Sequence, residues 1–133
     1  MQEKQTKEGI LRIYAVLCLL ITLPGCTPKG LKPPKESKIT AYYTRSATVT
    51  VEGEMGTVPP WSEVVVEDMV GTEAARVIAD RNGSFNINFC AGSWARENFE
   101  NCTYQGDLSS GDSIKVYYVD MGMTGPPLIL TIR

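Results

Sequence analysis

The chain has 133 residues, of which 43% are apolar and 21% charged, a composition typical of a folded domain rather than a disordered chain. It contains no histidine, which excludes serine–histidine and cysteine–histidine catalytic pairs and the usual zinc sites. From residue 39 to the end, six basic side chains stand against twelve acidic ones, and a surface of that sign repels nucleic acid. We therefore expect no nucleic-acid partner.

The first 25 residues have the order of charge and hydropathy of a secretory signal peptide. Lys4, Lys7 and Arg12 precede the apolar run 13–23, IYAVLCLLITL. These eleven residues make about 17 Å of helix, which is too short to span a hydrocarbon core of about 30 Å comfortably. No A-x-A pattern of small residues follows the run, so the sequence for conventional signal cleavage is missing.

Residues 23–26, Leu-Pro-Gly-Cys, resemble the lipobox of bacterial lipoproteins, in which a branched apolar residue, a tolerant position and a small residue precede a cysteine. The resemblance implies cleavage between Gly25 and Cys26, a diacylglyceryl group on the Cys26 sulfur, and often a further acyl chain such as palmitate on the new N-terminus. Two or three chains hold a protein on a bilayer firmly. Thr27 rather than Asp follows the cysteine, which by the same resemblance favours the outer membrane of a bacterial cell envelope. An uncleaved anchor and a free thiol are the alternatives.

Residues 26–38 are predicted to form a flexible basic spacer between the lipidated cysteine and the domain. The stretch 27–38, TPKGLKPPKESK, contains three prolines and four lysines but only one large apolar side chain. It therefore has too few apolar side chains to form a packed element. Its lysines either lie against anionic lipid or merely keep the spacer extended in solvent. Both interpretations are open at this point.

From residue 39 onward the apolar residues recur with a period of two, which is typical of strands with one buried face. Turn residues separate seven such segments at roughly 8 to 12 residue spacing, as expected for an antiparallel immunoglobulin-like β-sandwich over residues 39–133. The predicted strands are 39–44, 47–52, 63–67, 74–79, 84–89, 113–119 and 128–132. The predicted core is Val49, Val51, Val64, Val66, Val77, Phe85, Ile87, Phe89, Ile114, Val116, Tyr118, Leu128, Leu130 and Ile132.

Within this region the sequence is similar to small bacterial immunoglobulin-like and carboxypeptidase-regulatory-like repeats. The similarity covers most of residues 47–127 and lies in VTVEGEMGTVPPWSEVVVED, VIADRNGSFNI and GDSIKVYYVDMGMTGPP. It implies the sandwich fold but not the function, because such folds host unrelated functions. The chain departs from the repeats by an insertion of about twenty residues before Gly111.

The insertion, residues 90–110, is the most individual stretch of the predicted domain. Cys90 and Cys102 are expected to form a disulfide, since an exported protein meets an oxidising compartment. One interpretation is a stapled binding loop that presents Trp94, Phe99 and Tyr104 to a partner. The other is that Trp94 and Phe99 fold back over an open end of the sandwich.

Nothing in the sequence indicates catalysis, a cofactor or a metal. Asp80 and Asn82 carry oxygens that suit calcium, but a hairpin turn explains the same residues. We therefore expect a non-catalytic lipoprotein, anchored in the membrane of the envelope, whose module binds another envelope protein or serves envelope assembly. One alternative is a glycan-binding or adhesive module in which Trp61, Trp94 and Tyr104 stack on sugars; another is a structural spacer.

Overall fold

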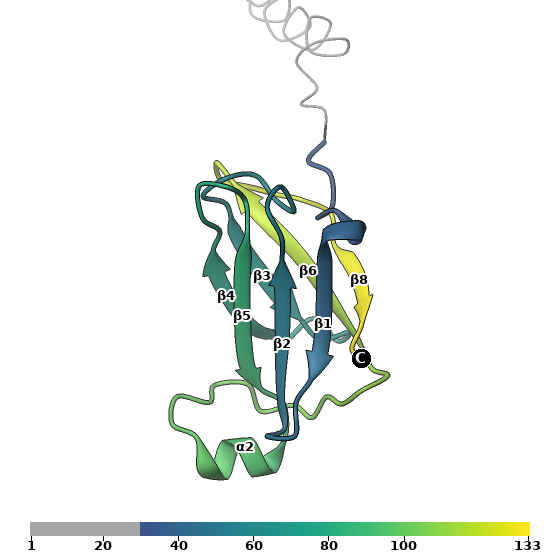
Figure 1. The fold of residues 1–133 in the computed structure, drawn as a ribbon, viewed down its shortest axis with the longest axis vertical. Coiled ribbons are helices and arrows are strands. Elements are labelled where there is room, and N and C mark those ends of the chain that lie inside the picture. Colours follow the sequence, from purple (N-terminus) through teal and green to yellow (C-terminus); the bar gives the residue numbers. More distant parts are fainter. Residues whose placement is uncertain (1–29) are drawn as a thin grey trace, which may run out of the picture. The chain divides into compact units, whose positions relative to one another are not determined.

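The computed structural model describes residues 30–133, which form eight strands in two antiparallel sheets (Figure 1). The first sheet has the order β1-β2-β5, and the second has the order β4-β3-β6, with β7 and β8 both pairing with β6. The strands are β1 (Ile39–Tyr43), β2 (Thr48–Gly53), β3 (Glu63–Glu67), β4 (Glu73–Ile78), β5 (Phe85–Cys90), β6 (Ser113–Asp120), β7 (Met123–Thr124) and β8 (Leu128–Thr131). A 3-10 turn, η2 (Glu36–Lys38), precedes β1, and a short helix, α2 (Ser93–Asn98), follows β5.

The predicted all-β antiparallel sandwich is confirmed, with eight strands where seven were expected. Each of the seven expected strands is present within one or two residues of its predicted bounds, and β3 has the bounds that were expected. The sequence analysis missed β7, a two-residue strand that pairs with the end of β6, and it missed α2. Neither element is long enough to show a period in the sequence.

The core lies between the two sheets and follows the alternation in the strands. Val49 pairs with Phe89 and Val51 with Ile87, so the apolar faces of β2 and β5 point the same way. Twelve of the fourteen predicted core residues are buried, and Val77 and Leu128 are half-buried.

Val65 is fully buried although it lies on the outer face of β3. Its register partners are Arg76 on β4 and Tyr117 on β6. Arg76 is held across this face by ion pairs with Glu63 and Glu73, and the Tyr117 hydroxyl donates to Glu67 at 2.7 Å. Long polar side chains thus cover an apolar residue that the core prediction left out.

The two lateral edges of the sandwich differ. At one edge the backbone of Arg133 connects the sheets, because its N–H donates to Ala41 at 3.0 Å and its carbonyl accepts from Tyr43 at 2.8 Å. At the other edge β4 and β5 lie side by side but belong to different sheets (Figure 1). Within the part of the chain that the structure describes, neither β4 nor β5 has a paired strand on this side.

Part of the predicted spacer belongs to the folded unit, which spans Lys32–Arg133. Pro34 is buried, the N–H of Lys35 donates to Thr57 at 3.1 Å, and the carbonyl of Lys38 accepts from Glu54 at 2.9 Å. Proline can be buried here without leaving a backbone donor unpaired, because it has none. The boundary between spacer and domain therefore moves from residue 39 to about residue 32.

The expectations for the N-terminal segment lie outside the described residues, since they concern the signal peptide 1–25, Gly25 and Cys26. None of the helices among residues 30–133 has the length and apolar character required to cross a membrane.

Candidate functional site

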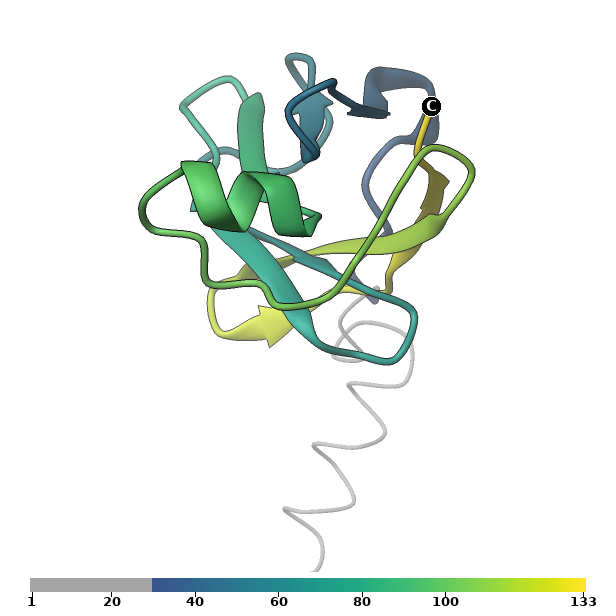
Figure 2. The same cartoon turned by 90° about the horizontal axis from the view of Figure 1, so that it is seen from below.

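The insertion forms the end of the sandwich at which β5 finishes and β6 begins (Figure 2). Because β5 and β6 belong to different sheets, the chain between them must cross this end. The crossing starts with the N–H of Ala91 donating to Ala47 at 2.8 Å, and it is fixed again where the N–H of Leu108 donates to Ala91 at 2.8 Å. Helix α2 has no side-chain cap at its N-terminus and is only six residues long, so tertiary contacts must hold it.

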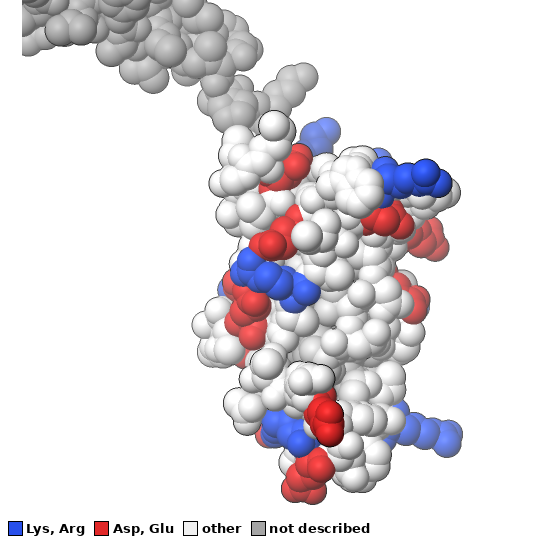
Figure 3. All heavy atoms as spheres, turned by 90° about the vertical axis from the view of Figure 1, so that its left-hand side faces the viewer, with Lys and Arg blue, Asp and Glu red and all other residues white. Residues whose placement is uncertain are grey.

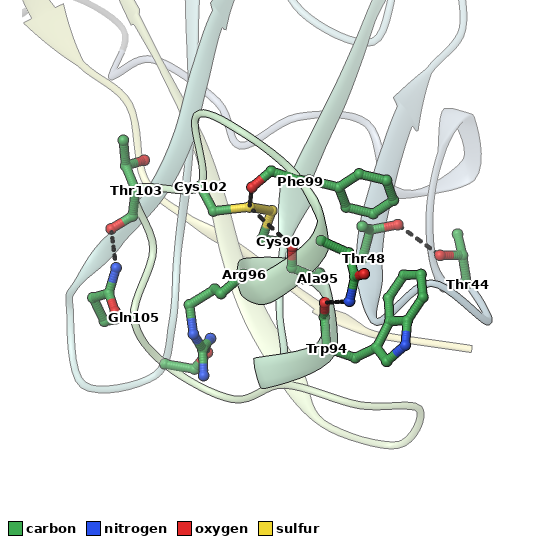
Figure 4. Close-up of a disulfide and its surroundings, with 12 residues drawn as sticks. Thr44, Thr48, Cys90, Trp94, Ala95, Arg96, Phe99, Cys102, Thr103 and Gln105 are labelled. Carbon is green, nitrogen blue, oxygen red and sulfur yellow. Dashed lines mark hydrogen bonds between the residues drawn. A yellow bond between two sulfur atoms is a disulfide. The ribbon is translucent and has the colours of Figure 1, made fainter.

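The disulfide expected between Cys90 and Cys102 is present and joins the last residue of β5 to the crossing loop. The two Cα atoms are 5.5 Å apart, a usual separation for a disulfide. Ala95 of α2 is fully buried in a small cluster with Ala47 and Cys90, and Cys102 packs against this cluster. The disulfide and Ala95 together fix α2 to the sandwich (Figure 4).

Arg96 holds the second half of the loop against α2. Its Nη1 donates to the carbonyl of Gly106 at 2.7 Å, and its Nη2 donates to Asp107 Oδ1 at 2.8 Å. The Arg96 side chain is mostly buried in this position, while Asp107 is exposed. The loop is thus fixed at Cys102 and again at residues 106–107.

Tyr104 is not available to a partner, contrary to the expectation that it belongs to an exposed binding surface. Only 4% of the residue is exposed, its ring meets Phe89 edge to face at 5.8 Å, and its hydroxyl donates to Asp68 Oδ2 at 2.9 Å. Burial, and then the contact with Asp68, raises the pKa of Tyr104 to about 12. Tyr104 is therefore a core residue that ties the loop to the second sheet.

Asp68, which the sequence analysis did not single out, has a structural role of its own. Its Oδ1 accepts hydrogen bonds from the N–H groups of Val70 at 3.1 Å and Thr72 at 2.9 Å, which closes the turn between β3 and β4. The aspartate before Gly71 is a sign of such a turn, but the partner on Tyr104 lies 36 residues away, and no local pattern indicates it.

Trp94 and Phe99 combine features of both interpretations of the insertion. Their rings pack on each other edge to face at 5.8 Å, yet Trp94 is 53% and Phe99 44% exposed. Figure 4 shows both rings on the side of the loop that faces Thr44 and Thr48. A pair of large aromatic side chains that is rigidly held and half-exposed is typical of an interface anchor.

A groove of about 560 Å³ lies beside this pair, along the edge where β4 and β5 meet. Its walls come from Glu73–Arg76 on β4, from Asn88–Cys90 on β5 and from residues 99–103 of the loop, which include Phe99. A second hollow, of about 370 Å³, lies on the Trp94 side of the pair. Few charged side chains cover the middle of the β4–β5 side, and acidic and basic groups gather at its margin (Figure 3).

The charged side chains that line the groove are Glu73, Glu100 and Arg76. Arg76 pairs with Glu73 and Glu63, and the hydrogen bond from Arg76 lowers the pKa of Glu73. The pKa of Arg76 is raised for the same reason. A ligand in this groove therefore meets backbone edges, amide side chains, an aromatic ring and an excess of one negative charge.

The three rings of the glycan hypothesis do not share a surface. Tyr104 is buried, and Trp61 lies in the connection between β2 and β3, where its N–H donates to Asp80 at 3.2 Å. Asp80 precedes β5, whereas Trp94 follows the other end of that strand. Trp61 and Trp94 therefore belong to opposite ends of the sandwich.

Asp80 serves the hairpin turn that was the alternative to a calcium ligand. Its Oδ1 accepts hydrogen bonds from the N–H groups of Asn82 at 2.8 Å and Ser84 at 3.0 Å. These bonds, with that from the Ser84 hydroxyl as the largest contribution, lower the pKa of Asp80. Across residues 30–133, no three side chains of the usual metal-binding types are grouped together.

Comparison with known proteins adds no relative: no protein-family model matches the sequence, and no curated protein matches it.

Proposed function

We propose that this protein is a non-catalytic lipoprotein of a bacterial cell envelope, anchored through Cys26, whose sandwich binds another envelope protein. The lipobox-like sequence supports the anchor, and the fold supplies a rigid module. The disulfide-fixed end supports the binding role, because it presents Trp94 and Phe99 beside a groove. An assembly subunit of this kind needs a surface rather than a reaction centre.

The single observation that carries the proposal is the exposed pair Trp94 and Phe99, of which Phe99 lines the β4–β5 groove. The disulfide and the Arg96 contacts hold the loop in place before binding, so little conformational freedom is lost when a partner covers the pair. Aromatic anchors near the centre of an interface contribute about 2 kcal/mol or more each when they are truncated. The segment that precedes β1 lies at the other end of the sandwich, so the pair is at the end of the domain far from this segment (Figure 1).

Photocrosslinking in living cells tests the binding role. A photoreactive amino acid at position 100, which lines the groove, should yield a discrete adduct with a partner protein. The same amino acid at position 129, on the exposed face of β8, should not yield it. Trp94→Ala or Phe99→Ala should lower the adduct roughly 30-fold if each ring contributes about 2 kcal/mol.

The matched control is Ile129→Ala, which removes an exposed apolar side chain from β8 and should leave the adduct unchanged. An adduct that survives both substitutions in the pair would exclude this surface as the binding site.

The anchor is tested separately. The intact mass of the purified protein should match a chain that begins at Cys26 and carries acyl groups, and Cys26→Ser should abolish both processing and labelling by palmitate. A mature protein with an unmodified N-terminus in the soluble fraction would refute the lipoprotein proposal.

A further inference from the structure

Exposed apolar side chains gather at the end of the sandwich opposite the disulfide. Trp61 is 67% and Met121 95% exposed, and Met55, Ile78 and Met123 are exposed as well. They belong to the connections between β2 and β3 and between β6 and β7, to the end of β4, and to β7 itself. Figure 1 shows these connections at the same end as the segment that precedes β1.

Backbone hydrogen bonds between the loops hold this end in shape. The N–H of Trp61 donates to Asp80 at 3.2 Å, and the N–H of Gly56 donates to Asn82 at 2.8 Å. Trp61 has a φ of 63°, in the left-handed region that bulky residues seldom adopt. Such a backbone conformation persists only where the surrounding structure imposes it. Residues held in this way cluster at functional sites. Here the conformation keeps the indole outside the core.

The spacer between this end and the proposed anchor is short. Pro34, the first buried residue of the described chain, is eight backbone steps from Cys26, and this stretch reaches about 28 Å at most when fully extended. This is comparable to the thickness of a bilayer's hydrocarbon core. The spacer is therefore too short to hold this end far from a membrane surface.

The distribution of charge favours the same orientation. The segments at this end, residues 30–38, 54–62, 79–84 and 121–127, carry four basic and three acidic side chains. The segments at the other end, residues 44–47, 68–72, 91–112 and 132–133, carry three basic and five acidic ones. With Asp120, which pairs with Met123 at the first end, the first set is neutral, whereas the second has a net charge of −2, so an anionic bilayer repels the second end more than the first.

We propose that the end formed by the β2–β3, β4–β5 and β6–β7 connections rests on the surface of an anionic bilayer, with the Trp61 indole in the headgroup region. The inference rests on the anchor of the proposed function. It adds a second contact that sets the orientation of the domain, so that the groove and the aromatic pair point away from the lipid. Tryptophan is the residue type that membrane interfaces select most strongly.

The two tryptophans of the chain provide the test, since one lies at each end. The full mature protein is reconstituted in vesicles of phosphatidylcholine containing about one third phosphatidylglycerol, with and without brominated chains. Trp94→Phe leaves Trp61 as the only tryptophan, and its emission should shift to the blue and fall about twofold or more with brominated lipid. Trp61→Phe leaves Trp94, whose emission should stay within about a tenth of its value.

Each outcome decides a different point. Protein that does not float with the vesicles and lacks acyl mass refutes the anchor, and this proposal falls with it. Floating protein in which brominated lipid leaves Trp61 emission unchanged refutes the proposed contact and leaves the anchor intact. Shielding of Trp61 from aqueous acrylamide without quenching by brominated lipid would mean that a second copy of the chain covers this end, and would also refute the contact. Equal urea midpoints for the two variants establish that folding is not the cause of any difference.

Discussion

Replacing Tyr104 by Phe should destabilise the protein by about 1.5–3 kcal/mol, because it removes one hydrogen bond to a buried carboxylate. The Tyr104 hydroxyl donates to Asp68 Oδ2 at 2.9 Å, and Asp68 is itself buried. The substitution keeps the ring that packs edge to face on Phe89. It also keeps the two backbone donors to Asp68 Oδ1, so the turn between β3 and β4 should survive.

The assay is urea unfolding of the purified protein with the disulfide intact. The midpoint should fall while the dependence of the unfolding free energy on urea stays the same, since the extent of buried surface does not change. In a thermal scan a loss of this size lowers Tm by roughly 6 °C or more, at about 4–8 °C per kcal/mol for a domain of this length.

Tyr42→Phe is the matched control. Its hydroxyl donates to Glu52 Oε1 at the same distance, 2.9 Å, but on the solvent-exposed face of β1. We expect a cost of less than about 0.5 kcal/mol there. A Tyr104 variant no less stable than the Tyr42 variant would refute the reasoning that burial of the Asp68 pair makes this bond strong.

Three further predictions concern the insertion and the outer face of the second sheet. Replacing both disulfide cysteines by Ser should cost about 3 kcal/mol in the chain-entropy model, measured by urea unfolding against the wild type. Gly106→Ala should destabilise by about 1–3 kcal/mol because a Cβ there would collide with the Tyr104 hydroxyl, whereas Gly30→Ala, which meets no neighbour, should be neutral in the same assay. Burial, and then the bond to Glu67, raises the pKa of Tyr117 to about 12. The stability that this provides is complete below about pH 10, where unfolded tyrosine titrates, and is lost as the pH rises toward 12. Urea midpoints across this range should fall less steeply in Tyr117→Phe, and an unchanged slope would contradict the assignment.

The strands could be predicted because the alternation that indicates each strand lies within the residues of that strand. Phe85, Ile87 and Phe89 alternate with polar residues, and this alternation is enough to place one face of β5 in the core. The sequence was less informative for β4, which is an edge strand. Ile78 is exposed there, and the strand begins one residue earlier than expected. A β-bulge between β3 and β4 at Val66 and Glu67 shifts the register near this point, and periodicity alone gives no sign of it.

The candidate site was predictable only in part, because most of its contacts are non-local. The disulfide followed from two cysteines in a chain with an export signal, without any knowledge of the fold. The burial of Tyr104 depends on Asp68, and the position of the loop depends on Arg96 reaching Gly106 and Asp107. The sequence does not indicate which aromatic side chain of a polar loop is buried. The folded structure shows that one ring is buried and that the other two are half-exposed.

The connection of Arg133 to β1 affects how the domain would respond to force. Strand β1 begins at the end where the chain enters the domain and runs toward the disulfide end, paired along its whole length with β2 and joined to Arg133 on its other side. Hydrogen bonds in such pairs lie across the strand direction. Tension between the two ends of the domain would therefore strain all of them together instead of opening them one after another. A domain loaded in this way resists being pulled apart far better than one that can be peeled from an edge.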